Sequence, residues 1–246
     1  MLLAAGRGER MRPLTDTCPK PLLAVRGKPL MQWHLEALQR GGCQQVVVNT
    51  DWLGERIVAQ FGDQFLPEVP SDRPGLALRY SHEGHDFGGA LETAGGIVRA
   101  LPLLDEVFWV LAADVFTPGF EFSQAALDRF TVSDMLAHLW LVPNPAHNPA
   151  GDFGLQAAAD GAPALALNLS KGDPRPRHTF STIGLYRHAL FETPWCGITA
   201  GNPQGRKAPL APLLRRAMDQ GRVSAELYHG SWTDVGTPQR LAELNV

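Results

Sequence analysis

Cysteine is scarce in this 246-residue chain, and an excess of basic charge is absent. The three cysteines, Cys18, Cys43 and Cys196, are odd in number and lack the spacing of a metal site, so we expect reduced thiols in a cytoplasmic protein. The formal net charge of −3 excludes a globally basic nucleic-acid binder. Any site for anions must therefore be local and built from a few placed arginines and lysines.

The sequence also lacks any long hydrophobic run. Its longest apolar segment, residues 107–113, has the length of a strand and is far too short to span a membrane. The apolar residues 1–5 are too few for a secretory signal, and the basic residues follow them instead of preceding them. We therefore expect a protein with no membrane partner.

The first half of the chain alternates strand and helix patterns. Apolar runs predict strands at residues 1–5, 46–48, 76–80 and 107–113. Helical spacing between them, with glycines or prolines at the ends, predicts helices at residues 29–41, 53–61 and 93–101. Repeated strand–helix units of this kind predict a parallel sheet with helices on both faces.

The second half is less regular. Strands are expected at residues 135–142, 153–158, 179–186 and 223–228, a hairpin turn at Asp160-Gly161, and a helix at residues 209–220. Residues 66–75 and 170–178 are rich in proline and polar residues and predict loops. The whole chain thus predicts an α/β fold with a Rossmann-like, mostly parallel sheet flanked by helices, extended after about residue 134.

A glycine-rich, basic loop directly follows the first strand. Gly6 and Gly8 free the backbone to approach phosphate closely, and Arg7, Arg10 and Arg12 lie in the same loop. The loop has Met11 where a dinucleotide-binding fingerprint needs its third glycine, which disfavours an oxidoreductase. A Walker loop is also absent. Taken alone, the loop is a weak signal, because basic loops usually face solvent without binding a ligand.

Lys20 follows ten residues after Arg10, between Pro19 and Pro21. The two prolines fix the backbone from which its flexible side chain starts, although an isolated lysine in such a turn would be an ordinary surface residue. The combined pattern, Leu-Ala-Ala-Gly-x-Gly-x-Arg-Met-x-Pro-Leu-Thr at residues 3–15 and Pro-Lys-Pro-Leu at 19–22, resembles the signature of sugar-phosphate nucleotidylyltransferases.

This resemblance implies an enzyme that joins a nucleoside triphosphate to a sugar 1-phosphate and releases pyrophosphate. It implies that Arg10 and Lys20 are catalytic. It also implies that the nucleotide is held by Ala4, Ala5, Gly6, Gly8, Glu92 and Gly95, the last two in the small-residue segment 90–96 that faces the base in the family. Residues 1–134 would form the nucleotide-binding core, and residues 135–246 the sugar-binding half of one domain.

Two aspartates stand at points where a carboxylate can serve as a ligand. Asp114 ends the most hydrophobic strand, at the edge where open α/β sheets bind ligands, and Asp234 lies in Trp-Thr-Asp-Val-Gly-Thr. By position alone each could equally cap a turn or helix; Thr237 and Pro238 resemble a helix start. The resemblance assigns both aspartates to Mg²⁺, which takes few protein carboxylates and completes its shell with water and phosphate.

The predicted chemistry needs no general base. The attacking phosphate monoester has a second pKa of ~6, so it is already ionised near neutral pH. The difficulty is to bring it against a polyanionic triphosphate, and cations and alignment overcome that. We find no convincing Ser–His–Asp or Cys–His pattern, and we expect in-line attack on the α-phosphorus without a covalent enzyme intermediate.

Several segments resemble one branch of the family, the uridylyltransferases that act on N-acetylmuramate 1-phosphate, and the likeness extends over nearly the whole chain. The segments are residues 49–54, 144–145, 151–153 and 207–215 and the Trp-Thr-Asp-Val-Gly-Thr segment at 232–237. It favours UTP as the nucleotide, with Asn144 and Asp152 on the sugar, although both could simply form turns. The second-lysine motif Glu-Lys-Pro of larger relatives is missing, and Lys171 is at best a loose substitute. The cation for a muramate carboxylate is left open among Arg177, His178, Arg206 and Lys207.

Three other readings compete with this one. The first is a mannose- or glucose-1-phosphate nucleotidylyltransferase of the same fold, the second a non-catalytic nucleotide-binding regulatory subunit, and the third a dinucleotide-binding oxidoreductase. A non-catalytic subunit could lose any of Arg10, Lys20, Asp114 and Asp234, so the presence of all four disfavours that alternative. Larger relatives carry long C-terminal assembly segments that this chain lacks, so we expect a monomer.

Overall fold

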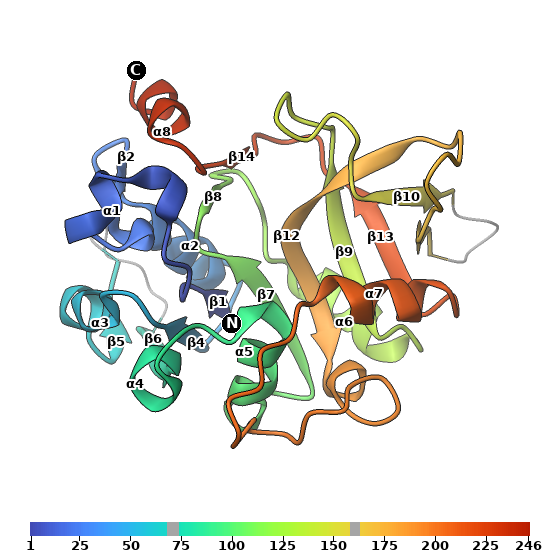
Figure 1. Ribbon diagram of the computed structural model, residues 1–246, viewed down its shortest axis with the longest axis horizontal. Coiled ribbons are helices and arrows are strands. Elements are labelled where there is room, and N and C mark those ends of the chain that lie inside the picture. The colour runs from blue at the N-terminus through green and yellow to red at the C-terminus, as the bar shows by residue number, and fades with distance from the viewer. Residues whose placement is uncertain (68–73, 158–162) are drawn as a thin grey trace.

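A ten-stranded sheet runs through the computed structural model, which describes residues 1–67, 74–157 and 163–246 (Figure 1). Across the described residues the strand order is β10-β11-β13-β9-β12-β7-β1-β4-β6-β5. The strands are β1 (Leu2–Leu3), β4 (Gln45–Thr50), β5 (Gln64–Phe65), β6 (Leu76–His82), β7 (Val107–Ala112), β9 (Ala137–Val142), β10 (Phe153–Gln156), β11 (Leu165–Leu167), β12 (Arg177–Arg187) and β13 (Val223–Leu227).

Strands β7, β1, β4 and β6 are parallel, as the alternating pattern predicts. Five of the six residues of β4 are buried, because helices cover the sheet on both sides. The three helices predicted for the first half of the chain are α2 (Leu30–Arg40), α3 (Gly54–Phe61) and α5 (Glu92–Ala100). The carboxyl ends of the four strands share one edge, so the loops after β1 and β7 meet there.

The second half adds antiparallel pairings. The long strand β12 runs antiparallel to both β7 and β9 and so joins the two halves of the sheet. It contains an irregularity between Phe180 and Gly184, where Thr182 has a φ of 69°. Residues 177 and 178, predicted to belong to a loop, are instead the first residues of β12, because they pair with β10. The predicted turn at Asp160-Gly161 lies outside the described residues.

The core follows the alternation of side chains along the strands. In β7, Phe108 and Val110 belong to one buried cluster, whereas Trp109 and Leu111 belong to another on the opposite face. The first cluster is covered by α5 and α7 (Ala211–Met218), and the second by α2, α3 and α6 (Gln124–Val132). Packed side chains therefore cover both faces of the sheet at β7.

The last helix, α8 (Pro238–Leu244), returns to the beginning of the chain (Figure 1). Its apolar side packs on a third cluster around β2 (Ala24–Val25) and β3 (Lys28–Pro29), and Asn245 bonds to the backbone of Ala24 and Arg26. Thr237 caps the helix by accepting from Arg240 N, as the sequence predicts. No helix of the described residues is both long and apolar enough to cross a membrane.

Candidate active site

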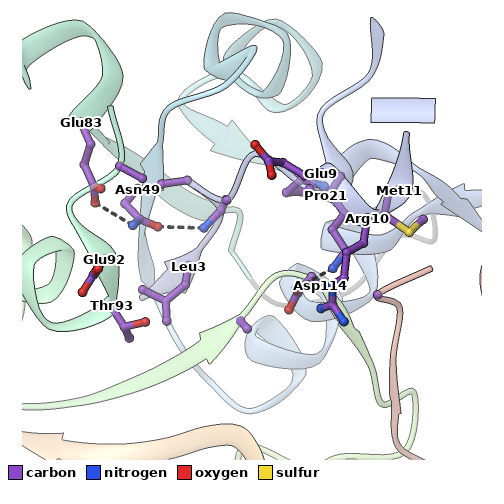
Figure 2. A pocket seen from close by; sticks show the side chains of 18 residues that line it. Leu3, Glu9, Arg10, Met11, Pro21, Asn49, Glu83, Glu92, Thr93 and Asp114 are labelled. Atoms are coloured by element: carbon purple, nitrogen blue, oxygen red, sulfur yellow. Dashed lines mark hydrogen bonds and ion pairs between the residues drawn. The ribbon is translucent and has the colours of Figure 1, made fainter. Parts of the chain in front are cut away.

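A cavity of about 500 Å³ opens where β1 and β7 end (Figure 2). It is lined by eight of the twelve residues that the sequence predicts for the site, namely Ala4, Ala5, Gly6, Gly8, Arg10, Lys20, Glu92 and Asp114. We call it the strand-edge pocket. Its place at the carboxyl ends of parallel strands is where open α/β sheets bind their ligands.

Lys20 and Asp114 meet inside this pocket. Lys20 Nζ lies 2.6 Å from Asp114 Oδ2, and the lysine side chain is only 8% exposed. Lys20 opens a single turn of 3₁₀ helix, Lys20–Leu22, after Pro19, and Asp114 lies two residues after the end of β7. A nearly buried ammonium group facing a half-exposed carboxylate gives the pocket a cation placed where it can meet an incoming phosphate.

The three arginines of the glycine-rich loop have different surroundings. Arg7 stacks on Trp52, with its guanidinium carbon 3.8 Å from the ring centre, and donates to the carbonyl oxygen of Thr15. Arg12 pairs with Asp16. In the described part of the chain Arg10 has no such partner, and it points into the pocket beside Asp114 (Figure 2). Arg10 is thus the arginine whose charge is available to a ligand.

Gly8 has a geometric reason to be glycine. Its φ of +68° lies in the left-handed region, and a Cβ there would sit 3.1 Å from Thr15 Cγ2. The hydroxyl of Thr15, a fully buried residue, donates to the Gly8 carbonyl oxygen at 2.8 Å. This contact folds the loop back on itself and keeps Arg10 at the pocket.

The far wall of the pocket rests on a buried polar chain that sequence reasoning missed. Glu83, fully buried after β6, accepts from Leu91 N and from Asn49 Nδ2, both at 2.7 Å. Asn49 Oδ1 in turn accepts from Ala4 N at 2.8 Å, so the chain connects the loop after β1 to the start of α5 (Figure 2). Burial raises the pKa of Glu83, against the opposing effect of the two donors.

Glu92 and Gly95 occupy different environments. Glu92 is exposed at the start of α5 with a φ of 60° and lines the pocket. Gly95 is buried outside the pocket lining, and its N–H donates to Ala208 O at 3.1 Å. A Cβ at Gly95 would lie 2.6 Å from Arg206 O. Its small size therefore lets the segment before α7 pass close to α5.

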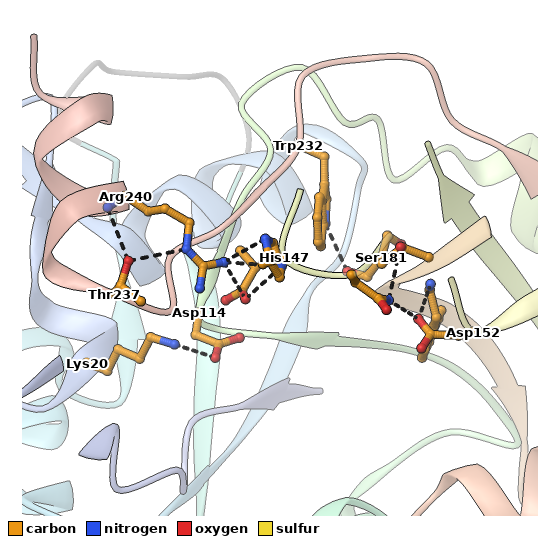
Figure 3. A network of polar contacts seen from close by, with 12 residues as sticks. Lys20, Asp114, His147, Asp152, Ser181, Trp232, Thr237 and Arg240 are labelled. Carbon is orange, nitrogen blue, oxygen red and sulfur yellow. Dashed lines mark hydrogen bonds and ion pairs between the residues drawn. The ribbon is translucent and has the colours of Figure 1, made fainter. Parts of the chain in front are cut away.

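Asp234 is brought beside Asp114 by a two-stranded bridge between β14 (Thr233–Asp234) and β8 (Val115–Phe116). Val235 N donates to Asp114 O at 3.0 Å, which holds the two segments together. Asp234 Oδ2 lies 2.8 Å from Arg240 Nη1 and 3.3 Å from His147 Nε2 (Figure 3). Asp234 is not in the pocket lining, but Gly236, two residues later, is.

The two aspartates offer what a magnesium ion requires. Over the described residues no cluster of three or more histidine, cysteine, aspartate or glutamate side chains could hold a metal by itself. Asp114 and Asp234 are 39% and 19% exposed, so both carboxylates remain accessible to solvent. Mg²⁺ is commonly held by one or two carboxylates together with substrate phosphates, so this donor set fits it.

Asn144 and Asp152 lie in the loop between β9 and β10, away from the pocket. Asn144 donates to Arg177 O and accepts from Thr179 Oγ1, both at 3.0 Å. Asp152 Oδ2 accepts from Phe180 N at 2.9 Å. The structure therefore uses both side chains to attach this loop to β12, which is the turn-forming role that the sequence left open.

The chain resembles known proteins over its whole length. A model of the nucleotidyl transferase family matches residues 1–246. An N-acetylmuramate alpha-1-phosphate uridylyltransferase from Neisseria meningitidis serogroup B is 46% identical over 99% of this chain and 95% of its own length, and one from Caulobacter vibrioides is 33% identical over 99% and 96%.

The fold comparison agrees with the sequence comparison. The crystal structure of a glucose-1-phosphate thymidylyltransferase from Bacillus anthracis superposes with a TM-score of 0.71 at 16% identity, covering 99% of this chain and 92% of that one. The α/β fold expected from the sequence is thereby confirmed. Because the family model spans every residue and two relatives match almost end to end, the chain belongs to the nucleotidyl transferase family.

Proposed function

We propose that this chain transfers a uridylyl group from UTP to N-acetylmuramate 1-phosphate and releases pyrophosphate. The observation that carries the proposal is the Lys20–Asp114 pair inside the strand-edge pocket, next to Arg10, which has no ion-pair partner among the described residues. The choice of sugar and base follows the names of the Neisseria and Caulobacter relatives, which this chain matches over nearly its whole length.

The residues of the pocket act mainly on charge. The sugar phosphate attacks as an anion, and Arg10 and Lys20 would neutralise the triphosphate as the two polyanions approach. Mg²⁺ held by Asp114 and Asp234 would supply further charge neutralisation at the phosphates. Gly6 and Gly8 leave backbone N–H groups open to the triphosphate. The pocket thereby aligns the attack, and its residues need not abstract a proton.

The two halves of the chain would bind different substrates. Residues 1–134 supply most of the pocket and would bind the nucleotide, with Glu92 and its neighbours beside the base. Residues 135–246 would bind the sugar and supply Asp234. Asn144 and Asp152 would act on the sugar by shaping the loop between β9 and β10, because their polar atoms are engaged by β12.

A panel of substrates tests the proposal. Pyrophosphate release should be fastest with UTP and N-acetylmuramate 1-phosphate in the presence of Mg²⁺. Strong preference for GTP and mannose 1-phosphate would overturn the assignment of substrates, and no release with any pair would favour a regulatory nucleotide-binding subunit. We further propose a monomer acting in the cytoplasm in the recycling of cell-wall sugars, which size-exclusion chromatography and a deletion strain would test.

A further inference from the structure

Arg240 forms the closest contact to the carboxylate of Asp234. Its Nη1 lies 2.8 Å from Asp234 Oδ2, and the side chains are 16% and 19% exposed. Arg240 Nε also donates to Thr237 Oγ1 at 3.3 Å. The guanidinium is therefore held at a defined place by the first turn of α8, with its charge directed at one of the two predicted metal ligands (Figure 3).

This ion pair lies directly behind the wall of the strand-edge pocket. Gly236 lines the pocket, and a Cβ at that position would sit 2.7 Å from Arg240 Nη2 and 2.9 Å from both carboxylate oxygens of Asp234. A glycine here leaves the guanidinium and the carboxylate uncovered toward the pocket. A modest rotation of the long arginine side chain would bring its charge to a bound phosphate.

The surroundings of Arg240 face the second half of the chain. Its Nη1 lies 3.2 Å from both ring nitrogens of His147, in the loop between β9 and β10. The next residue, Asn148, bonds to Asp152 in that same loop (Figure 3). Arg10 and Lys20, by contrast, come from the loops after β1. Arg240 thus touches both the helix that packs on the N-terminal segment and a loop of the second half of the chain.

Each predicted metal ligand is consequently paired with its own cation, Asp114 with Lys20 and Asp234 with Arg240. We propose that Arg240 is a further phosphate-binding cation of the enzyme, in addition to Arg10 and Lys20, and that Asp234 holds it in place while the site is empty. When substrates and the divalent cation bind, Asp234 exchanges Arg240 for the cation, and the guanidinium turns to the phosphate of the sugar 1-phosphate. This inference rests on the proposed function.

Steady-state kinetics test the phosphate contact. Arg240→Gln should raise the KM for the sugar 1-phosphate about 10- to 100-fold, the range expected for loss of a charge-assisted hydrogen bond, and change the KM for UTP by less than about threefold. Arg240→Lys should recover part of the loss. Gln239→Ala is the matched control, because Gln239 is exposed on the same helix and its side chain bonds within that helix, to Glu243. Circular dichroism would establish that each variant is folded.

Titration with Mn²⁺ alone, followed by electron paramagnetic resonance, provides a readout without turnover. In the absence of nucleotide, Arg240→Gln should bind Mn²⁺ at least about threefold more tightly than the wild type, because Asp234 is no longer neutralised. A merely structural arginine predicts equal or weaker binding. Either an unchanged KM for the sugar phosphate or unimproved Mn²⁺ binding would overturn the inference. Failure of the proposed function would appear separately, as a wild type inactive with every substrate pair.

Discussion

Lys20 Nζ lies 2.6 Å from Asp114 Oδ2, although 94 positions separate the two residues in the sequence. The contact exists because β1 and β7 are hydrogen-bonded neighbours and the loops that follow them leave the sheet at the same edge. The pair places a cation beside one of the two carboxylates proposed to bind Mg²⁺, before any substrate arrives.

Replacing Lys20 by methionine should nearly abolish turnover and leave the fold intact. Met has a similar length but no charge, so the pocket loses a phosphate-binding cation, with an expected fall in kcat of about 10²–10⁴-fold. Asp114 is 39% exposed, so water can solvate it and the free energy of unfolding should change by about 1 kcal/mol or less. Pyrophosphate assays and urea denaturation measure both quantities. A variant that retains wild-type turnover would rule Lys20 out of the chemistry.

Glu83→Gln should destabilise the protein and weaken nucleotide binding. The carboxylate accepts two hydrogen bonds, from Asn49 and Leu91, whereas a glutamine must direct its own N–H₂ at one of these donors. An unsatisfied buried donor costs about 1–3 kcal/mol, which urea denaturation would detect. Because the same bonds hold the far wall of the pocket, the KM for UTP should rise as well.

Glu55→Gln is the matched control for that experiment. This substitution makes the same chemical change, from carboxylate to amide, at an exposed position of α3. The free energy of unfolding of this variant and its KM for UTP should stay close to those of the wild type. If both glutamine variants behaved alike, the buried chain through Asn49 would have no special part in shaping the pocket.

Thr182→Gly should stabilise the protein. Thr182 is β-branched yet has a φ of 69°, and its buried hydroxyl has no hydrogen-bond partner among the described residues. Relief of such strain is worth about 1–3 kcal/mol, reduced by the extra chain entropy of glycine in the unfolded state, so we expect a net gain of about 1 kcal/mol. Thermal denaturation measures it. Thr182→Ala separates the effect of the unfavourable φ from that of the buried hydroxyl, because alanine removes the hydroxyl and keeps the φ.

Acid should destabilise the fold partly through His138. Burial, with a smaller effect of Arg129, lowers its pKa from 6.5 to about 4, so the folded state favours the neutral ring. The unfolded chain binds a proton more readily, and this contribution to stability is complete above pH 6.5 and is lost as the pH falls toward 4. Between pH 7.5 and 5 the wild type should lose roughly 1–2 kcal/mol more than His138→Gln. Equal losses in urea denaturation would contradict the assignment.

Much of the fold could be predicted because its signals are local. The apolar run at residues 107–113 and the helical spacing after Pro29 correspond to β7 and α2 within about one residue. The antiparallel pairings of β12 could not be read from the sequence, since they depend on which distant strand lies beside it. Residues 177 and 178 were misassigned for that reason: their polar, proline-flanked sequence hides a pairing made with β10.

The candidate site was predictable where a motif marks it. Gly8, Lys20 and Asp114 lie in patterns that place them at strand ends, and the fold brings them together. Glu83 lies in no such pattern, and Asn49 lies in a segment, residues 49–54, that was assigned no role in the site. The one available signal was that each is a polar residue at the carboxyl end of a strand expected to be parallel, the same property that singled out Asp114.

The packing of α8 on the β2–β3 hairpin determines how much of the chain must be synthesised before the enzyme can become active. A nascent chain that has emerged as far as Trp232 already contains the glycine-rich loop, Lys20 and Asp114, but it lacks Asp234 and Arg240. Those two side chains are held in position by a helix that packs against the first thirty residues. Residues through α8 must therefore be synthesised before Asp234 and Arg240 can take these positions, and chains that stop before α8 should be inactive.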